Sequence, residues 1–591
     1  MSLPRTPVLR FGMFEIDTDA GEVRKAGGRI KLQSQPFKVL ALLASRAGEV
    51  LTRQEIEQQI WGDQTHVDFE LGLNYCIKQI RTALEDDAGK PRYVETLPRR
   101  GYRFIAAVEG HQRTRLAQSR QRPMLAVLPF GNLTGDAGQE YFADGLTEEL
   151  ISQLGKLNPQ QLGVIAFTSA KQYKDTAKGI DQIGRELNVD FILEGSVRRT
   201  RDRVRIAAQL IQVSDQTHLW AEAYNRTLDD IITIQTDVGE RVANSLALEL
   251  IPGHQAAMTR ASTRNSMAYD AYLRGRYYWN KRTEADFWKA LKYFETAIEQ
   301  DPHYAPAYVG LADVYNIIAF YSGLPPIEAS EKSRAAVRKA VEIDSRLPEV
   351  YTAVAYARLL YEWDFSGAEE AFRHALELNP NQVTGHYWYA LFLAAMERPD
   401  EALAHIQSAM QLDPLSLVIN CHKGWVLYFA RRYDDAILQL LNTIEMDQNF
   451  LLSRYFLGVV YLRTGRFADG IVQFEKAKET SNNHPGPQAG LSAALALSGK
   501  KSEARKILGS LEKLADRRYV APYFIALVHL ALGDAEEAFD WLEKAFKEHS
   551  AYLSNIKADP ALDPIRSDPR FLKLIRRVGL PETASAGGSK Q

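Results

Sequence analysis

Hydrophobic and polar residues alternate over short stretches at the start of the chain and then change to a helical spacing. Alternation places one set of side chains on each face of a strand, so these stretches predict a small antiparallel sheet with Gly and Asp turns. The predicted strands are residues 8–16, 22–25 and 29–32. The helical spacing that follows indicates a domain that combines a sheet with helices.

Three amphipathic helices are predicted after this sheet, the first over 35–47. The second begins at Thr52, whose side chain can cap it while Glu55 completes a capping box. The third covers 73–84, with polar residues on the faces that lie away from its apolar stripe. That apolar stripe is Leu73, Ile77, Ile80 and Leu84. Two short strands around the turn Pro98-Arg99-Arg100-Gly101 complete the segment.

Residues 124–251 mix apolar strands with helical stretches, which predicts an α/β domain large enough for a core of its own. The predicted strands are 124–130, 164–167, 191–199, 204–213 and 218–224. The predicted helices are 145–154, 180–187 and 231–250. Asp144 is the predicted cap of the first of these helices.

A 34-residue period governs the remainder of the chain. Small residues recur at Ala368, Ala402, Ala436, Gly470, Ala504 and Ala538. Large apolar residues follow four positions later, at Phe372, Ile406, Leu440, Phe474, Leu508 and Leu542. Prolines keep the same step at Pro380 and Pro414. This pattern is typical of tetratricopeptide (TPR) repeats, and an aperiodic helical bundle would not keep it over five steps. TPR arrays form concave surfaces that bind peptides, so polar or aromatic first-helix residues are candidate groove residues. These are Asn316, Tyr351, His386, Asn420 and Arg454.

Composition adds a charge asymmetry to this picture. Residues 1–123 hold 20 Lys and Arg against 15 Asp and Glu, whereas the whole chain holds 72 against 74. A mildly basic head on an acidic body suits one DNA-binding module on a protein-binding scaffold. The two cysteines, Cys76 and Cys421, have no companion at metal-ligand spacing and form no disulfide framework, which fits a reducing compartment.

Nothing in the sequence has the pattern of a leader or a membrane anchor. The first residues lack the apolar core of a signal peptide, and no apolar run reaches the roughly 20 residues that span a bilayer. We therefore expect a cytoplasmic protein without a membrane partner. Residues 108–123 are expected to be a polar, basic linker and residues 581–591 a disordered tail.

Residues 8–107 resemble an OmpR/PhoB-type winged helix of the CadC-like subgroup. The matching strings are Leu51-Thr52-Arg53-Gln54-Glu55-Ile56, Ile60-Trp61-Gly62 and the hairpin from Pro91 to Phe104. The resemblance implies that the third helix enters the major groove of DNA and that the hairpin wing lies near the minor groove. CadC-like proteins usually carry a transmembrane helix after the wing, and the polar residues 108–123 depart from that pattern.

The candidate DNA-binding residues lie on the third helix, on the wing and at the start of the second helix. They are Arg53, Asn74, Tyr75, Lys78, Gln79, Arg81, Thr82, Arg99 and Arg100. Lysine and arginine neutralise phosphates or donate to guanine, and an Asn or Gln amide pairs with adenine through its oxygen and nitrogen. Charge alone would equally fit a solvated helix face, but the element order and the matching strings favour DNA binding.

Residues 124–251 resemble the TolB-like domain found beside CadC-like regulators and some nucleotide cyclases. The matching strings are Leu128-Pro129-Phe130-Gly131-Asn132, Tyr141 to Leu150, Leu193 to Arg198 and His218 to Glu222. No cyclase catalytic domain accompanies them. Acidic residues in a first helical turn are stabilised by the helix dipole, so Asp144, Glu148 and Glu149 need no catalytic role.

The expected architecture has three parts. They are an α+β winged helix at 8–107, an α/β TolB-like domain at 124–251 and an all-α TPR superhelix with a capping helix at 268–580. We expect a transcriptional regulator that binds double-stranded DNA and is neither an enzyme nor dependent on a cofactor or metal. A protein or peptide in the TPR groove is the expected second partner, with RNA polymerase and a dimer on DNA as further candidates. The alternative is a TPR scaffold whose winged helix binds protein or DNA without sequence preference.

Overall fold

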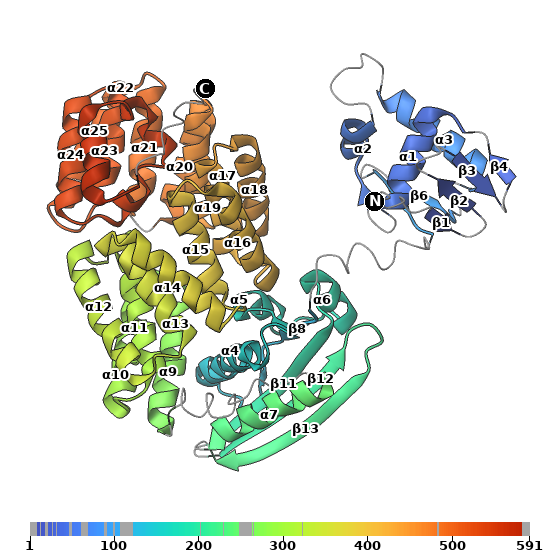
Figure 1. Ribbon diagram of the computed structural model, residues 1–591, viewed down its shortest axis with the longest axis horizontal. Helices are drawn as coiled ribbons and strands as arrows, with labels where there is room; N and C mark the ends of the chain where they lie inside the picture. The colour runs from blue at the N-terminus through green and yellow to red at the C-terminus, as the bar shows by residue number, and fades with distance from the viewer. Residues whose placement is uncertain are drawn as a thin grey trace, which may run out of the picture. The chain divides into compact units, whose positions relative to one another are not determined.

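The chain divides into two compact units, Met1–Gln121 and Arg122–Gln591, which are described separately (Figure 1). The computed structural model describes residues 9–11, 14–17, 22–25, 28–30, 32–46, 50–60, 69–87, 91–97, 101–106, 122–200, 203–227, 230–246, 263, 265–321, 323–481 and 484–581. Within these ranges, no helix is both long enough and apolar enough to cross a membrane.

The first unit contains two small sheets and three helices, in the order expected for a winged helix. One sheet is β1(Leu9–Phe11)-β2(Phe14–Asp17)-β3(Glu22–Lys25)-β4(Gly28–Ile30), with all neighbours antiparallel. The helices are α1(Ser34–Ser45), α2(Arg53–Ile60) and α3(Phe69–Leu84). The second sheet has the order β5(Val50–Leu51)-β7(Gly101–Phe104)-β6(Val94–Leu97). The third helix therefore begins four residues earlier than the apolar pattern indicated.

A single apolar core joins the sheets and helices of this unit, and all four predicted stripe residues of α3 lie in it together with Cys76. The Phe11 ring packs edge-on against Phe104 and stacks on Phe14. The expected capping box is present. Thr52 Oγ1 accepts from the Glu55 backbone N–H at 3.2 Å, and Glu55 Oε2 accepts from the Thr52 N–H at 2.7 Å. These bonds hold the pKa of Glu55 below its usual value.

The second unit begins with a mixed sheet of order β10-β8-β11-β12-β13. β10(Gly163–Val164), β8(Met124–Val127) and β11(Phe191–Thr200) are parallel, whereas β12(Arg203–Gln212) and β13(His218–Thr227) extend the sheet antiparallel. The short strand β9(Gly131–Asn132) pairs with the far end of β11. All four residues of β8 are buried, because helices cover both faces of the parallel part.

The helices that cover the sheet are α4(Glu140–Leu157), α5(Phe167–Ala170), α6(Ile180–Leu187) and α7(Ile231–Ser245). α4 and α7 pack with Leu125 and Val127 on one face, and α6 packs with Ala126 and Ile192 on the other. The expected cap at Asp144 is wrong. The helix starts at Glu140, so Asp144 lies in its second turn, where it is buried and pairs with Lys171 at 3.0 Å and Lys174 at 2.6 Å.

Eight helix pairs and a final helix form the rest of the described chain, and their first and second helices alternate along the sequence. The pairs are α9(Ser266–Trp279) with α10(Glu284–Gln300), α11(Ala305–Ile318) with α12(Pro326–Ile343), α13(Pro348–Ala357) with α14(Phe365–Leu378), α15(Val383–Ala395) with α16(Pro399–Leu412), α17(Leu417–Phe429) with α18(Tyr433–Met446), α19(Leu451–Arg463) with α20(Phe467–Thr480), α21(Pro485–Leu497) with α22(Lys501–Ala515), and α23(Pro522–Leu532) with α24(Ala535–Lys547). The final helix is α25(Pro569–Val578).

The residues that carry the 34-residue period lie where helices approach one another. All six small residues from Ala368 to Ala538 are buried, as are the six large residues four positions on. A Cβ added at Gly458 would lie 2.7 Å from the Phe474 ring, and one at Gly424 would lie 2.6 Å from Leu440. The period therefore records close contacts between paired helices, as the sequence predicted.

The mixed-sheet domain packs against the array at the connections that precede α13, α15 and α17. Asn381 donates to the carbonyl oxygens of Gly155 and Leu162 at 2.9 and 2.8 Å. Ser169 Oγ donates to Asp413 Oδ1 at 2.5 Å, and Lys156 pairs with Glu349 at 2.8 Å. The first repeat helix, α9, contributes to the hydrophobic core of the mixed-sheet domain. Its residues Tyr269 and Leu273 pack in the core under the sheet.

A segment near the C-terminus packs across the first helices of the array, at the ends opposite to those that contact the mixed-sheet domain. This closing segment, residues 549–566, includes the 3-10 turns η7(Ala551–Asn555) and η8(Pro560–Ile565). His549 stacks on Trp363 and faces the carbonyl of Tyr361 in the π-turn η6(Arg358–Glu362). Arg463 donates to the Pro560 carbonyl at 3.2 Å. The array is thus held by the mixed-sheet domain at one edge and by its own closing segment at the other.

Candidate nucleic-acid interface

Helix α3 presents a polar face whose residues share one side of the helix. Asn74, Lys78 and Thr82 recur every four residues and are exposed, and Tyr75 beside them is 47% exposed. Gln79 and Arg81 are half-buried. The structure therefore brings six of the nine sequence-predicted residues onto one helix surface, beside the two strands of the wing.

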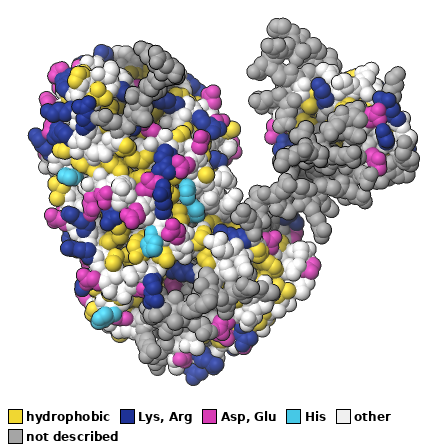
Figure 2. Space-filling model, in the orientation of Figure 1, with side chains coloured by type: hydrophobic (Ala, Val, Ile, Leu, Met, Phe, Trp, Pro, Cys, Tyr) yellow, Lys and Arg dark blue, Asp and Glu magenta, His cyan; other side chains and the backbone are white. Residues whose placement is uncertain are grey.

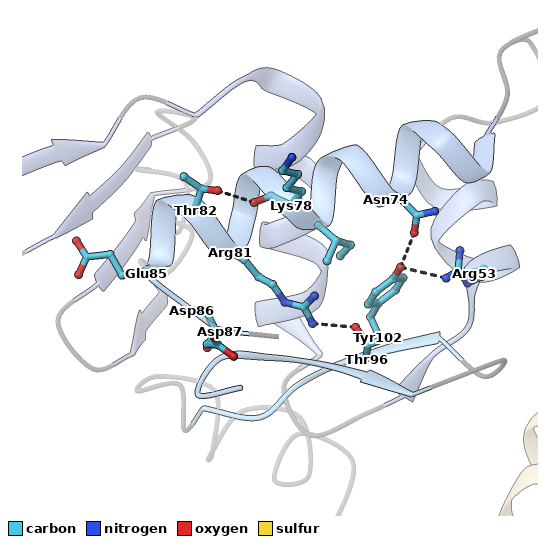
Figure 3. Close-up of a pocket in the computed structure, with 11 residues that line it drawn as sticks. Arg53, Asn74, Lys78, Arg81, Thr82, Glu85, Asp86, Asp87, Thr96 and Tyr102 are labelled. Atoms are coloured by element: carbon cyan, nitrogen blue, oxygen red, sulfur yellow. Dashed lines mark hydrogen bonds between the residues drawn. The ribbon is translucent and has the colours of Figure 1, made fainter. Parts of the chain in front are cut away.

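An open hollow lies between this face and strands β6 and β7 (Figure 3). Its lining includes Arg53 from α2, Thr96 from β6 and Tyr102 from β7. Arg53 comes directly after the capping residue Thr52, which places its side chain at the start of α2 and beside the wing. Seven of the predicted residues thus lie in one region of the first unit. Arg99 and Arg100, at the tip of the hairpin, are outside the described residues.

Arg81 ties α3 to the wing. Its Nη2 donates to the carbonyl of Val94 at 2.9 Å and to Thr96 Oγ1 at 2.8 Å. Figure 3 shows the guanidinium reaching from the helix to β6 rather than outward. The sequence could not distinguish this orientation from a base-reading one, because both place an arginine on the same face of the helix.

Tyr102 makes a second connection between the wing and the helices. Its hydroxyl donates to Asn74 Oδ1 at 3.0 Å and accepts from Arg53 Nη2 at 3.2 Å. The ring is 3% exposed, and the Arg53 guanidinium lies 5.3 Å from its centre. The ring therefore lies in the core while the hydroxyl joins α3 to α2, a use for which the sequence carries no signal.

Acidic residues mark the end of this face. Asp86 accepts from the backbone N–H groups of Arg92, Tyr93 and Val94, with the shortest bond at 2.6 Å. Glu85 pairs with Lys25 at 2.7 Å, which lowers the pKa of its carboxyl. The bonds of Asp86 connect the end of α3 to residues 92–94 at the start of β6. A negatively charged ligand on the α3 face is therefore expected nearer to Lys78 than to the helix end.

The larger unit shows no comparable basic face in the view of Figure 2. Hydrophobic side chains gather over the middle of its visible face, with Lys and Arg mixed among Asp and Glu. No group of three or more His, Cys, Asp or Glu residues with metal-binding geometry occurs among the described residues. Both cysteines are free and buried, as expected for packed apolar residues, and burial raises the pKa of the Cys421 thiol.

The five residues expected to line the TPR groove serve the array itself. Asn316 is fully buried, accepts from Ser333 at 2.7 Å and donates to the Ala353 carbonyl at 3.0 Å. The other four each bond to the carbonyl oxygen six residues earlier, in the connection before their helix. These pairs are Tyr351 with Ser345, His386 with Pro380, Asn420 with Pro414, and Arg454 with Gln448. A polar residue at this repeat position therefore caps a connection between units.

The acidic residues of α4 are likewise committed to contacts within the larger unit, but Glu148 and Glu149 lie in the third turn of the helix and not in the first turn expected from the sequence. Glu148 accepts from Arg276 at 2.5 Å and from Asn280 at 3.0 Å, both at the start of the array. Glu149 accepts from Gln153 at 3.2 Å. With Asp144 held between two lysines, the three carboxylates contribute to packing within the larger unit.

Family models match three parts of the chain. Residues 27–104 match the C-terminal domain of transcriptional regulatory proteins, and residues 120–241 match the second domain of HilA/YgeH-like transcriptional regulators. Residues 358–416 and 422–485 match tetratricopeptide repeats. The OmpR/PhoB-type DNA-binding domain and the TPR repeats expected from the sequence are thus confirmed.

Relatives extend the similarity over most of the chain. Over 425 residues it is 25% identical to the transcriptional regulator HilA of Salmonella typhimurium, which covers 71% of this chain and 73% of that protein. Over 238 residues it is 34% identical to a putative adenylate cyclase 3 of Rhizobium meliloti, which covers 40% of each. Among solved structures, the DNA-binding domain of E. coli CadC is 26% identical over 18% of this chain and 97% of that one, with a TM-score of 0.16.

These matches support a DNA-binding transcriptional regulator with a TPR region. The alignment with the adenylate cyclase spans less than half of that protein's length. The middle domain contains a mixed sheet and matches the HilA-like domain model.

Proposed function

We propose that this protein regulates transcription by binding a specific double-stranded DNA site through the first unit. Helix α3 lies in the major groove in this proposal, and the hairpin of β6 and β7 lies beside the minor groove. The observation that carries the proposal is the exposed polar face of α3, which stands next to the wing in a region that matches the regulatory domain model.

Several residues of the α3 face, and the arginines beside it, are proposed to contact DNA in different ways. Lys78 neutralises a phosphate, since its side chain is exposed and no ion pair to it is found in the described chain. Gln79 reads a base edge with its amide, and Tyr75 and Thr82 contact the backbone or an apolar base edge. Arg53 lies where a phosphate would pass between α3 and α2. Arg99 and Arg100 are proposed to enter the minor groove, whose negative potential attracts arginine.

The larger unit is proposed to bind the effector or partner protein that controls regulation. Its middle domain, residues 124–251, is proposed to be TolB-like, and the repeats from 268 to 580 to bind a protein or peptide. RNA polymerase and a second copy of the chain on DNA remain proposed partners. The domain bounds 8–107 and 108–123 for the winged helix and its linker are proposed on the same basis.

We further propose that the protein is a cytoplasmic regulator without enzymatic activity, cofactor or metal. The carboxylates of α4, which would be the natural acids for catalysis in the middle domain, are engaged with Arg276, Lys171 and Lys174. The similarity to a putative adenylate cyclase covers 40% of this chain and is attributed to shared accessory regions.

Selection from genomic DNA tests the proposal. Purified full-length protein is incubated with fragmented genomic DNA, and the retained fragments are sequenced at several salt concentrations. A short motif shared by the fragments, with an affinity that falls with salt, is the expected result. Retention without any shared motif would instead support a TPR scaffold that binds DNA non-specifically, and no retention would exclude DNA binding.

A further inference from the structure

We infer that Asn74 is a positioning residue, which holds the wing against the recognition helix, and does not read a base. The inference rests on the proposed function, since it concerns how the α3 face and the wing are set for DNA. It assigns to Asn74, Tyr102 and Arg53 one shared task. Sequence reasoning gave Asn74 the opposite role, because an exposed asparagine on this face has the donor and acceptor that recognise adenine.

The first step is the use of the amide oxygen. Asn74 Oδ1 accepts the Tyr102 hydroxyl at 3.0 Å, so the side-chain oxygen is directed toward β7 (Figure 3). Recognition of adenine by asparagine needs the oxygen to accept from N6 and the nitrogen to donate to N7 together. The oxygen has a second lone pair, so the contact with Tyr102 fixes the orientation of the amide, and turning the amide fully toward a base would break the bond to Tyr102. The tyrosine is nearly buried, so its hydroxyl would then lose the partner to which it donates.

The second step is the continuation of the contact to α2. Arg53 Nη2 donates to the Tyr102 oxygen at 3.2 Å, and the guanidinium also lies over the ring. The hydroxyl of Tyr102 in β7 is therefore hydrogen-bonded to side chains from both α2 and α3. Gly101, one residue earlier, comes so close to β5 that a Cβ there would lie 2.0 Å from the Leu51 carbonyl oxygen. The start of β7, at Gly101 and Tyr102, therefore has little freedom to move relative to the helices.

The third step concerns a second contact between α3 and the wing, which is made to the other strand, β6. Arg81 bonds to Val94 and Thr96 of β6, two helical turns beyond Asn74, a separation of about 10 Å along α3. Each strand of the hairpin is thus attached to α3 by one side chain. Because the two attachments lie at different positions along α3, they fix both the distance and the angle between the helix and the wing. A DNA site must then match that spacing.

The role predicts which substitutions preserve function. Aspartate at position 74 keeps an oxygen acceptor for Tyr102 and loses the amide nitrogen, whereas alanine loses both. In the full-length protein, Asn74→Asp is expected to keep the wild-type sequence preference, with a lower affinity for every sequence because the added negative charge repels the phosphates. Asn74→Ala and Tyr102→Phe should each weaken binding about threefold to tenfold with the preference unchanged, in line with the loss of one hydrogen bond. The double variant should be no weaker than Tyr102→Phe alone, because Asn74→Ala removes only a contact that Tyr102→Phe has already removed.

The experiment has two readouts. Selection from a random DNA library compares the preferences of the wild type, the three single variants and the double variant, with Gln79→Ala as the control that should change a base preference. Amide hydrogen exchange on the same full-length proteins without DNA measures the wing directly. Faster exchange over β6 and β7 in Asn74→Ala and Tyr102→Phe, but not in Asn74→Asp, is expected.

A changed base preference in Asn74→Asp, or unchanged wing exchange in Asn74→Ala, would overturn the positioning role. Failure of the wild type to bind any DNA would overturn the proposed function instead. In that case the exchange data alone still decide whether Asn74 holds the wing.

Discussion

The carboxylate of Asp559 accepts a hydrogen bond from the hydroxyl of Tyr428, which lies 131 positions earlier in the chain, at 2.8 Å. Its second oxygen accepts from Tyr523 at 2.5 Å. All three side chains are buried, so one acidic residue of the closing segment joins α17 to α23 across the array. Arg431 adds a bidentate ion pair to Asp563, four residues on.

Replacing Asp559 with leucine should destabilise the larger unit by about 2–4 kcal/mol. The hydroxyls of Tyr428 and Tyr523 would be left buried without an acceptor, and each such group costs roughly 1–3 kcal/mol. Urea unfolding followed by tryptophan fluorescence measures the loss. Asp540→Leu, at an exposed position of α24, is the matched control and should change stability by less than about 0.5 kcal/mol. Equal stability of the two variants would show that the closing segment contributes little.

Gly458→Ala and Gly509→Ala should act in opposite directions, although both glycines lie inside helices. A methyl group at Gly458 would lie 2.7 Å from the Phe474 ring, so α19 and α20 must separate, at a cost of about 1–3 kcal/mol. Nothing lies within 4 Å of the same position at Gly509, where alanine should stabilise the helix by about 0.5–1 kcal/mol. Thermal unfolding of both variants measures the difference, and a stabilised Gly458→Ala would contradict the close packing.

Lys78→Ala should weaken binding to every DNA sequence and reduce the slope of log affinity against log salt by about one, because it removes a phosphate contact. Fluorescence anisotropy with a labelled site at several salt concentrations measures both effects. Lys38→Ala, at an exposed position of α1, should leave the slope unchanged. A loss that is confined to one base position would mean that Lys78 reads a base.

Two buried histidines of the array should each contribute a loss of stability as the pH drops from about 6.5 to about 4. Burial lowers the pKa values of His386 and His422 from 6.5 to about 4, and the His405 ring 2.9 Å from His386 adds to the effect there. The unfolded chain then binds more protons than the folded one in this window, which favours unfolding at acidic pH. Urea midpoints measured across the window should vary less in His386→Gln and His422→Gln than in His303→Gln. Parallel curves for all three would exclude this contribution.

A chain that ends before α9 should aggregate or unfold rather than act as an unregulated DNA-binding protein. Tyr269 and Leu273 complete the core under the mixed sheet, and a Cβ at Gly145 of α4 would lie 2.9 Å from Leu273. Removing them exposes apolar residues of α4. A chain cut after Gln121 leaves the first unit intact and should bind DNA. Comparing the yield and the circular dichroism of the two truncations tests this, and a folded chain ending at residue 262 would contradict it.

Local patterns predicted the parts that depend on neighbours in the sequence. The Thr52–Glu55 capping box and the buried stripe of α3 could be foreseen because their partners lie within a few residues. The 34-residue period repeats one helix-to-helix arrangement in every unit, and it therefore predicted the paired helices in which Gly458 meets Phe474, although these residues are 16 positions apart. Arg81 and Asn74 were placed on the correct helix face, but their partners Thr96 and Tyr102 lie 15 and 28 residues away, and no periodicity encodes such bonds.

The repeat residues expected to line the groove also form contacts within the array that their polarity alone did not reveal. Polarity at Asn420 or Arg454 suggested exposure to a ligand, whereas the unpaired carbonyl oxygens of the connections offered partners within the array itself. Asp144 was expected at a helix start because acids favour first turns, yet Lys171 and Lys174 pair with it one turn further along. Contacts made in the folded protein, and not the polarity of each residue, determined the role of each of these residues.

The closing segment also determines when the array can complete its folding during synthesis on the ribosome. Phe320 packs against Tyr552, and Trp363 stacks on His549, so these early surfaces lack these partners until the closing segment is made. At 5–20 residues per second, the roughly 230 residues between Phe320 and Tyr552 take about 10–50 s to synthesise. A nascent array therefore exposes aromatic surface for tens of seconds, which makes it a substrate for chaperones that bind growing chains. Synonymous codon changes that slow translation after α12 should lower the yield of folded protein without altering a single residue.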